Sequence, residues 1–388
     1  MELTPKGFVT KIFERAGIRI DGDAPWDITV HHPRFFRRVL RGSIGLGESY
    51  TDGDWDTPQL DATIRRLLRT GVPSSTLART GRILKDLRSR VANLQTRRRS
   101  RAVAEQHYDL DHRLYTQFLG PHNQYTCCFF DGTDDLRAAE ERKLEMLCDK
   151  LEIGADDRVL DIGSGWGGFV GYAARTRGCK AVGISLSGEQ IEYSRRYTSG
   201  LGVEIVKCDY RDLPQRFAPA SFDKILVCGM LEHVGHKNYR RIMQIILRLL
   251  STRGLFLLHT IGNRDITTIV DPWIEKYIFR NSMIPAMQQI ADAASGLFVI
   301  QAWENYGYYY SKTLRAWYEN FNRNWPNITR IEAVPRFDEK FRRMWNYYLL
   351  SCKAAFDVEE LHLWQIVMSK YGARSDVYGR VMKSAARS

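Results

Sequence analysis

From about residue 150 onward, short apolar runs alternate with longer segments in which apolar residues recur every three or four positions. The short runs predict buried strands, and the longer segments predict amphipathic helices. Regular alternation of the two is typical of a doubly wound α/β sheet, in which helices cover both faces of parallel strands. The predicted strands are 159–162, 181–185, 203–206, 224–228 and 255–260, and the predicted helices span about 166–177, 188–199 and 238–250.

A second pattern begins after residue 263, where aromatic residues become frequent. A late apolar segment at 361–367 predicts a final strand that closes the sheet. We therefore expect an aromatic-rich insertion before the last strands. Its aromatic residues are Trp273, Tyr277, Phe279, Tyr306, Tyr308, Tyr309, Tyr310, Trp317, Tyr318, Phe321 and Trp325.

Residues 1–73 predict a separate, small α+β domain. Segments 18–20 and 28–30 are short strand candidates around a turn-rich stretch, and the apolar residues within 35–40 have helical spacing. The stretch from Gly42 to Gly53 is dense in glycine and predicts a tight loop. No catalytic constellation is recognisable in this segment of the sequence, so we expect it to serve membrane docking or self-association.

Residues 74–105 predict a basic amphipathic connector. Leu77, Ile83, Leu84, Leu87, Val91 and Leu94 recur at steps that place them on one helical face. Such a basic amphipathic helix is typical of a membrane-surface segment. A linker helix packed on its own protein fits the same pattern equally well. The basic residues around the stripe are Arg79, Arg82, Lys85, Arg88, Arg90, Arg97, Arg98, Arg99 and Arg101.

Composition narrows the class of protein. The chain has 388 residues, 44% of them hydrophobic, which is ordinary for a globular protein with a large core. No apolar run reaches about 18 residues, and no signal peptide is recognisable. The seven cysteines are an odd number without metal-type spacing, which suits a reducing compartment better than a disulfide framework. We therefore expect a cytoplasmic protein. The net charge of +12 fits an anionic partner, either nucleic acid or an acidic lipid surface, and a merely soluble basic protein has the same composition. Nucleic acid is not expected, because no aromatic platform or recognised binding module accompanies the arginines.

The most informative segment is 159–169, where a strand runs through Asp161 into a glycine-dense turn. The turn formally matches the dinucleotide fingerprint, but a nicotinamide site also needs an acid at the tip of the second strand. That strand ends in Ser185, and the nearest acid, Glu189, falls inside the next helix. An acid on the first strand instead suits a ligand with an ammonium group and a sulfonium. The sequence therefore predicts S-adenosylmethionine, with a nicotinamide oxidoreductase as the alternative.

Residues at successive strand ends complete the predicted cofactor site. Asp161 would meet the ammonium group, Ser185 and Gln190 the ribose, and Asp209 the adenine amino group beside the ring of Tyr210. The cysteines have no metal-type spacing, and no metal is expected. The glycines of the turn allow a ligand to approach the backbone closely. They are Gly163, Gly165 and Gly167.

Four further segments, 125–130, 231–235, 258–262 and 305–310, carry unusual combinations of cysteine, glutamate, histidine and tyrosine. Together with the glycine turn they resemble the bacterial cyclopropane-fatty-acyl-phospholipid synthases, which are related to the mycolic acid cyclopropane synthases. The resemblance covers nearly the whole chain. It implies a class I methyltransferase sheet of Rossmann-like topology within a catalytic domain at 106–388.

The resemblance also implies the reaction and its residues. The methyl carbon of S-adenosylmethionine adds across a cis double bond of a phospholipid acyl chain, and a bound bicarbonate ion removes the proton that closes the ring. Tyr125 and Thr126 would touch the amino-acid end of the cofactor. Tyr308 and Tyr309 stay alternatives to Tyr310, and Glu232 would either accept from the ion or orient His259. The holders of the ion carried over by motif are Cys127, Glu232, His259, Tyr310 and the backbone at Ile261.

Partners follow from the same resemblance. We expect an unsaturated phospholipid in an anionic bilayer, peripheral association with the inner face of the cell membrane, and a homodimer. The aromatic-rich insertion would line the acyl tunnel. The closest alternative is a lipid C-methylase that forms a methyl or methylene branch through the same carbocation, and a non-enzymatic membrane binder is a further one. Arg280 stands where the family usually has proline, and the resemblance assigns it no role.

Overall fold

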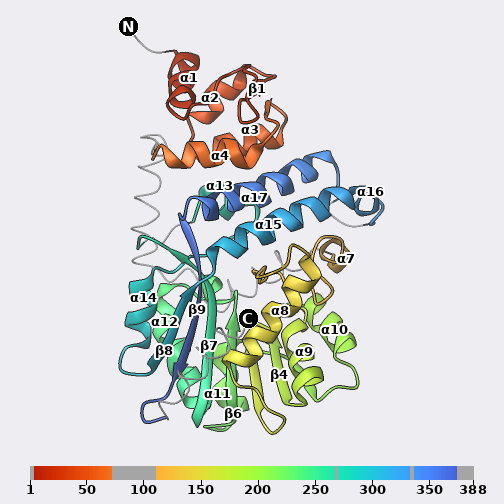
Figure 1. Cartoon of the computed structure of the whole chain (residues 1–388), viewed down its shortest axis with the longest axis vertical. Helices are drawn as coiled ribbons and strands as arrows, with labels where there is room; N and C mark the ends of the chain where they lie inside the picture. Colours follow the sequence, from red (N-terminus) through yellow and green to blue (C-terminus); the bar gives the residue numbers. More distant parts are fainter. Residues whose placement is uncertain (1–3, 72–110, 267–269, 333–335, 374–388) are drawn as a thin grey trace.

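A seven-stranded sheet forms the centre of the molecule (Figure 1). The computed structural model describes residues 4–71, 111–266, 270–332 and 336–373; the predicted connector at 74–105 lies outside them. The strand order is β5–β4–β3–β6–β7–β9–β8, and β9 runs antiparallel to both of its neighbours. The strands are β3 (Arg158–Ile162), β4 (Lys180–Ser185), β5 (Val203–Lys207), β6 (Phe222–Cys228), β7 (Leu250–Asn263), β8 (Val299–Asn305) and β9 (Leu361–Ser369).

This topology confirms the doubly wound α/β sheet. The prediction that the last strand closes the sheet is wrong in one respect, because β9 lies between β7 and β8 and the edge belongs to β8. We had not predicted β8. Its burial is only partial along its length, as suits an edge strand, so it lacks the continuous apolar run that marks a central strand.

Helices cover both faces of the sheet and give each a separate apolar core. On one face α8 (Leu136–Lys150), α9 (Gly168–Arg177) and α10 (Gly188–Tyr197) pack on side chains such as Val159 and Leu257. On the other face α12 (His236–Leu249) and α14 (Met287–Ala294) pack on alternate residues such as Leu160 and Phe256. The alternation follows from the two-residue period of a strand. Short elements complete this layer: α11 (Leu213–Arg216) and the 3-10 turns η1 (Tyr210–Asp212) and η2 (Leu231–His233).

The aromatic-rich insertion forms a third layer, between the sheet and the amino-terminal unit (Figure 1). Its two long helices place buried aromatic rings together, including Trp317 on α15 and Trp345 on α17. These rings belong to one core that also includes Phe118 and Tyr125. The helices of the insertion are α13 (Pro272–Tyr277), α15 (Gly307–Arg323), α16 (Trp325–Ile328) and α17 (Glu339–Asp357), and the short helix α7 (His112–Tyr115) adds Leu114 and Tyr115 to the same core.

The amino-terminal unit corrects one prediction. The stretch from Gly42 to Gly53 is not a loop, because it contains the helix α3 (Ser43–Thr51). Its glycines serve close packing: a Cβ at Gly45 would lie 1.8 Å from the Arg38 carbonyl oxygen, and one at Gly47 would lie 2.4 Å from the Trp273 ring. The strand expected at 18–20 is reduced to an isolated bridge between residues 20 and 28. The other elements are α1 (Pro5–Arg15), β1 (Thr29–Val30), α2 (Arg34–Val39), β2 (Trp55–Asp56) and α4 (Leu60–Arg69).

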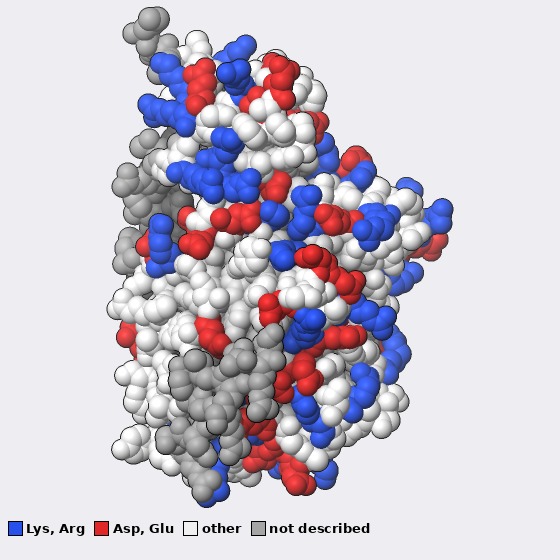
Figure 2. Space-filling view, in the orientation of Figure 1, with Lys and Arg blue, Asp and Glu red and all other residues white. Residues whose placement is uncertain are grey.

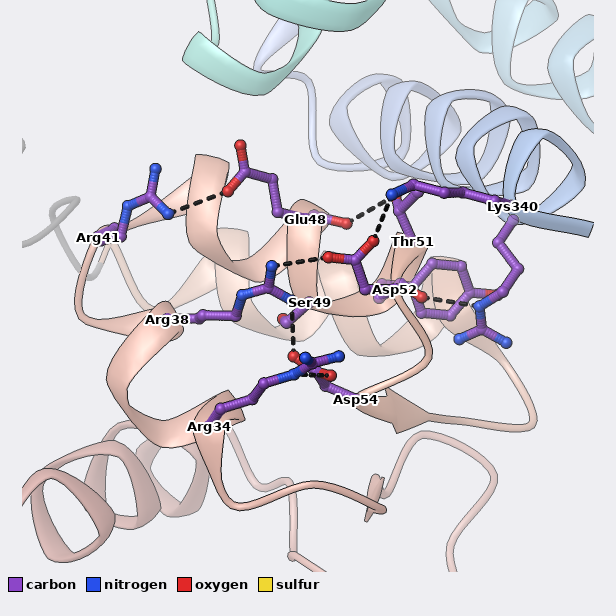
Figure 3. Close-up of polar contacts among 12 residues, drawn as sticks. Arg34, Arg38, Arg41, Glu48, Ser49, Thr51, Asp52, Asp54 and Lys340 are labelled. Atoms are coloured by element: carbon purple, nitrogen blue, oxygen red, sulfur yellow. Dashed lines mark hydrogen bonds and ion pairs between the residues drawn. The ribbon is translucent and has the colours of Figure 1, made fainter.

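Charged contacts attach this unit to α17 (Figure 3). Asp52 lies at the junction, 2.7 Å from the Lys340 ammonium of α17 and 2.6 Å from the Arg38 guanidinium of its own unit. Arg343, one turn along α17, donates to the backbone oxygen of Tyr50 at 2.7 Å and to that of Trp55 at 3.0 Å. The unit is therefore fixed to the helical layer that stands above the sheet.

Candidate active site

A cavity opens at the carboxyl ends of β3, β4, β5 and β6, the position at which open α/β sheets bind ligands. The structure brings together there nearly all the residues predicted for the cofactor, from four strand ends and from the loop before α8. Those that line it are Tyr125, Thr126, Asp161, Gly163, Gly165, Ser185, Gln190, Asp209 and Tyr210.

Gly167 is the exception among the predicted glycines, because it is absent from the described lining of the cavity. It precedes α9 with a φ of +80°, a value that favours glycine. A Cβ there would lie 2.9 Å from the Cβ of Ser194 on α10. Gly167 therefore lets two helices approach each other, whereas Gly163 and Gly165 shape the cavity wall.

Asp161 places a buried carboxyl oxygen without a hydrogen-bond partner at the cavity. Its Oδ1 atom is buried and has no hydrogen-bond partner. Burial raises the pKa of Asp161 to about 7, although the nearby Lys143 ammonium acts in the opposite direction. A buried carboxylate is costly unless a cation or donor meets it. The site therefore fits a ligand that carries an ammonium group.

The residues expected near the nucleoside are held in pairs. The Ser185 hydroxyl donates to Gln190 Oε1 at 2.9 Å. Both Asp209 oxygens accept from Arg211, one from its backbone N–H and one from its guanidinium, each at 2.9 Å. The same guanidinium lies 4.6 Å from the centre of the Tyr210 ring. Asp209 is therefore positioned before any ligand arrives, and its remaining lone pairs can still accept.

Sequence reasoning missed three buried charged residues on α8: Glu140, Lys143 and Lys150. Glu140 accepts from the backbone N–H groups of His122 and Gln124, each at 2.8 Å, and burial raises its pKa to about 7. Their spacing is a usable signal, because they occupy the inward positions of an otherwise amphipathic helix.

Lys143 extends this support to the cavity. Its ammonium group donates to Gln124 Oε1 and, at 2.9 Å, to the Thr126 hydroxyl. Thr126 lines the cavity and Cys127 follows it directly. Glu140 and Lys143 together therefore hold the 122–126 loop in place from the helix behind it.

A second group of predicted residues lies behind the cavity wall formed by Cys228 and Gly229. We call Cys127, Glu232, His259 and Tyr310 the polar cluster; all four are buried. His259 pairs with Cys228 across β7 and β6, and the Gly229 N–H donates to the His259 carbonyl oxygen at 2.9 Å. His259 and Cys127 therefore each adjoin residues that line the cavity: Cys228 and Gly229 for His259, and Thr126 for Cys127.

Glu232 and His259 each present one unsatisfied atom. Glu232 Oε1 accepts from the Ile261 N–H at 2.7 Å, whereas its Oε2 is buried without a partner. His259 Nδ1 lies 3.2 Å from the Gln365 side-chain amide, whereas its Nε2 is buried without a partner. Gln365, not Glu232, therefore orients His259. The Ile261 amide predicted to hold an ion is already used by Glu232.

Burial disfavours the charged forms of the residues in the polar cluster. Burial lowers the pKa of His259 well below its usual value, and burial raises the pKa of Glu232. Burial also raises the pKa of the Cys127 thiol, so it remains protonated. A neutral imidazole, a thiol and a carboxyl group of raised pKa can supply hydrogen-bond donors to a small anion. The two orphaned atoms fit such a group.

Tyr310 is the tyrosine that reaches the polar cluster. Tyr308 is 69% exposed, and Tyr309 packs its ring against Phe129 with centroids 4.9 Å apart. Tyr310 is buried, and its pKa is raised by burial and by the neighbouring Cys127 and Glu232. The helix α15 begins at Gly307, and its buried face includes Tyr310. The position of Tyr310 on that face therefore identifies it as the tyrosine of the polar cluster.

The cavity also includes residues that we had not predicted. Arg280, the departure from the family pattern, lines it together with Asn281 from the same segment. Met230 and His233 line it from the segment after β6. No pattern in the sequence connects the Arg280 segment with the glycine turn, because the link is made only by the fold.

A family model and the sequences of known proteins both relate the chain to the cyclopropane synthases. The model of the family "Mycolic acid cyclopropane synthetase" matches residues 95–366. The chain is 42% identical to the cyclopropane-fatty-acyl-phospholipid synthase of Escherichia coli K12, over 93% of this chain and 92% of that protein. It is 30% identical to the tuberculostearic acid methyltransferase UfaA1 of Mycobacterium tuberculosis, over 91% of this chain and 85% of the relative.

Solved structures agree on the fold. The cyclopropane synthase MmaA2 of M. tuberculosis aligns with a TM-score of 0.63 and 22% identity, over 72% of this chain and all of that one. Coclaurine N-methyltransferase aligns with a TM-score of 0.66 and 21% identity, over 84% of this chain and 99% of that one. The sheet is thus that of the class I methyltransferases. From the family match and the near full-length identity, the chain belongs to the mycolic acid cyclopropane synthetase family.

Proposed function

We propose that the chain transfers the methyl carbon of S-adenosylmethionine to a cis double bond in a phospholipid acyl chain and so forms a cyclopropane ring. The observation that carries the proposal is the buried polar cluster directly behind the cofactor cavity, in a chain 42% identical to an E. coli enzyme of that name. A simple methyl transfer needs only the cavity. Ring closure needs in addition a base at the reacting carbon.

The chain's own residues account for cofactor binding. Asp161 binds the ammonium group, Tyr125 and Thr126 border the amino-acid end, and Ser185, Gln190, Asp209 and Tyr210 hold the nucleoside. S-adenosylmethionine supplies an electrophilic methyl group. The 122–126 loop, held by Glu140 and Lys143, would fix the amino-acid end of the cofactor, and with it the orientation of the methyl group. Alignment of this kind accelerates a reaction with a weak nucleophile such as an alkene.

The polar cluster accounts for the final proton transfer. A bicarbonate ion bound there supplies the base. His259 donates from Nε2, Tyr310 and the Cys127 thiol add further donors, and Glu232 is held by the Ile261 N–H. Aromatic faces of the helical layer stabilise positive charge on the lipid carbon. The residues of the polar cluster are buried, so each of these contacts would be stronger than it is in water.

The partners and domains belong to the same proposal. Residues 106–388 form the catalytic domain, the aromatic layer lines the path of the acyl chain, and the amino-terminal unit with the 74–105 connector serves membrane docking, self-association as a homodimer, or both. No helix in the described part of the chain is long and apolar enough to cross a bilayer. Figure 2 displays basic side chains interspersed with acidic ones over the amino-terminal unit. The chain as a whole carries a net charge of +12, which favours the cytoplasmic face of an anionic membrane.

The experiment is an incubation of the purified protein with S-adenosylmethionine and vesicles of an anionic phospholipid that carries cis-monounsaturated chains. Fatty-acid analysis should reveal a product heavier by one CH2 that has lost its vinyl protons and gained ring protons by NMR. Excess S-adenosylhomocysteine should suppress it. A product of the same mass that keeps a double bond beside a new methyl or methylene branch would establish the C-methylase alternative, and unaltered lipids would contradict both.

A further inference from the structure

Three neighbouring strands place Glu304, Gln365 and His259 in one row. Gln365 on β9 pairs with His259 on β7 and with Glu304 on β8, so the three side chains lie side by side on one face of the sheet. Lys150, the last residue of α8, reaches over this row. Its ammonium group donates to Glu304, to Gln365 Oε1 at 2.7 Å and to the Tyr306 hydroxyl at 2.9 Å.

The contacts of Lys150 determine the direction of every hydrogen bond in the row. An ammonium group has three N–H donors and no acceptor, and all three have partners here. Gln365 must therefore turn its oxygen to Lys150, which leaves its NH2 group facing His259 Nδ1 at 3.2 Å. Tyr306 in turn donates to Glu304 Oε1 at 2.8 Å, so the Lys150 end of the row is also satisfied.

The direction of the Gln365 amide then fixes the histidine. An NH2 group only donates, so Nδ1 of His259 must be the acceptor and carry no proton. A neutral imidazole with a bare Nδ1 carries its proton on Nε2. Nε2 is the nitrogen of His259 that is buried without a hydrogen-bond partner.

We propose that Lys150 and Gln365 are positioning residues that hold His259 in the Nε2–H tautomer, so that it presents a donor and not an acceptor to the polar cluster. The role of that donor in ring closure rests on the proposed function; the tautomer itself does not. A donor at this point would bind an anionic base, whereas a bare Nε2 would repel it. Glu304 and Tyr306 act one step further away, by holding Lys150.

The decisive variant is Gln365→Glu. A carboxylate accepts from Lys150 and from His259 at the same time, so the imidazole proton should move to Nδ1. We expect kcat for lipid modification to fall about 10–100-fold, as for other second-layer positioning residues. The affinity for S-adenosylhomocysteine should be unchanged. The matched control is Gln301→Glu on the edge strand, where the glutamine donates to the Ser369 hydroxyl, and it should keep kcat.

The direct readout is the nitrogen spectrum of 15N-histidine-labelled protein, with His259 assigned by its loss in His259→Gln. The wild type should have a protonated Nε2 and a bare Nδ1, and Gln365→Glu should have the reverse. If Gln365→Glu does not fold, Lys150→Met should give a mixture of tautomers, because its Gln365 amide is free to turn over. A wild-type His259 protonated on Nδ1 or on both nitrogens overturns the proposal. Failure of the vesicle experiment with the expected spectrum would instead count against the proposed function alone.

Discussion

At the scale of single residues, the buried polar atoms fall into two groups. Glu140, Lys143 and Lys150 are satisfied by hydrogen bonds within the protein. One oxygen of Asp161, one of Glu232 and one nitrogen of His259 are buried without a partner. Native proteins pair nearly all their buried polar groups, so unpaired atoms at a cavity or among other polar side chains are candidate ligand positions. The first adjoins the cofactor cavity, and the other two belong to the polar cluster.

Asp161→Asn tests the cofactor side. Without a ligand the pKa of Asp161 is about 7, so the carboxylate that attracts an ammonium group is lost as the pH falls below 7. Calorimetry should give an affinity for S-adenosylhomocysteine that weakens about tenfold per pH unit below pH 7 in the wild type. The variant should bind weakly at every pH, with a flat profile. A pH-dependent affinity in Asp161→Asn would assign the titration to another group.

The same substitution has a stability consequence of known sign. The folded pKa of Asp161 lies above its unfolded value of 3.8, so this group stabilises the ligand-free protein at low pH, and that stability is lost between about pH 4 and pH 7. Asp161→Asn avoids this loss. Its melting temperature should therefore exceed that of the wild type at pH 8, and the difference should shrink towards pH 4.

Glu232→Gln and His259→Ala test the polar cluster. Both side chains lie behind the cavity wall and outside its described lining, so neither change should reach the cofactor. We expect turnover to become undetectable while calorimetric affinity for S-adenosylhomocysteine stays within about twofold. Loss of that affinity in either variant would mean that the two sites are not separated as described.

At the scale of elements, the central strands β3 to β7 and the glycine turn were predictable, because their apolar runs and strand-end residues are local features. The helix α15 also left a signal, since Tyr310, Leu314, Trp317 and Phe321 recur at helical spacing. We had used these aromatic residues only to mark an insertion, and not to place a helix. The prediction therefore does not decide which of Tyr308, Tyr309 and Tyr310 faces the polar cluster. The spacing of the buried charges on α8 was a usable signal, but their partners and the partner of His259 were beyond reach, because they depend on which elements pack together. The glycines of α3 led to a wrong prediction of a loop. A high density of glycine marks a turn, but it also occurs where a helix packs closely against its neighbours, as it does here.

The wall between the cavity and the polar cluster can be tested with Gly229→Ala. Gly229 has a φ of +62°, and a Cβ there would lie 2.7 Å from the Thr126 methyl group. The control Gly200→Ala, at φ +79° with open space around it, incurs only the backbone strain of about 1 kcal/mol. Gly229→Ala should lower kcat at least tenfold more than the control does, since it moves the 122–126 loop. Equal effects on kcat in the two variants would mean that the close packing of Gly229 against the 122–126 loop does not matter for catalysis.

At the scale of the whole molecule, the helical layer connects the amino-terminal unit to the site. Tyr347 on α17 contacts the ring of Tyr50 at 5.7 Å between centroids, and its neighbour Tyr348 accepts a hydrogen bond from Tyr125 at 2.9 Å. Tyr125 lines the cofactor cavity. If the amino-terminal unit shifts on α17, we expect the shift to move Tyr347 and Tyr348, and through Tyr348 to displace Tyr125 at the cavity.

Arg343→Met should weaken this attachment. The substitution removes donors to two backbone oxygens of the amino-terminal unit and to Asp56. Leaving such partly buried acceptors unpaired costs about 2–4 kcal/mol, which denaturant unfolding can measure. Arg330→Met, at an exposed position of the same layer, should leave the unfolding free energy within about 0.5 kcal/mol of the wild type. An equally small change in Arg343→Met would mean that the unit is held by other contacts.

The central claim is that a proton leaves the transferred methyl group and the ring then closes. The most direct measurement uses S-adenosylmethionine with a CD3 group and cis-unsaturated phospholipid vesicles, followed by mass spectrometry and NMR of the released fatty acids. Ring formation predicts a product that keeps two of the three deuterium atoms and has no double bond. A product that keeps all three, or that keeps two together with a double bond, would contradict the account.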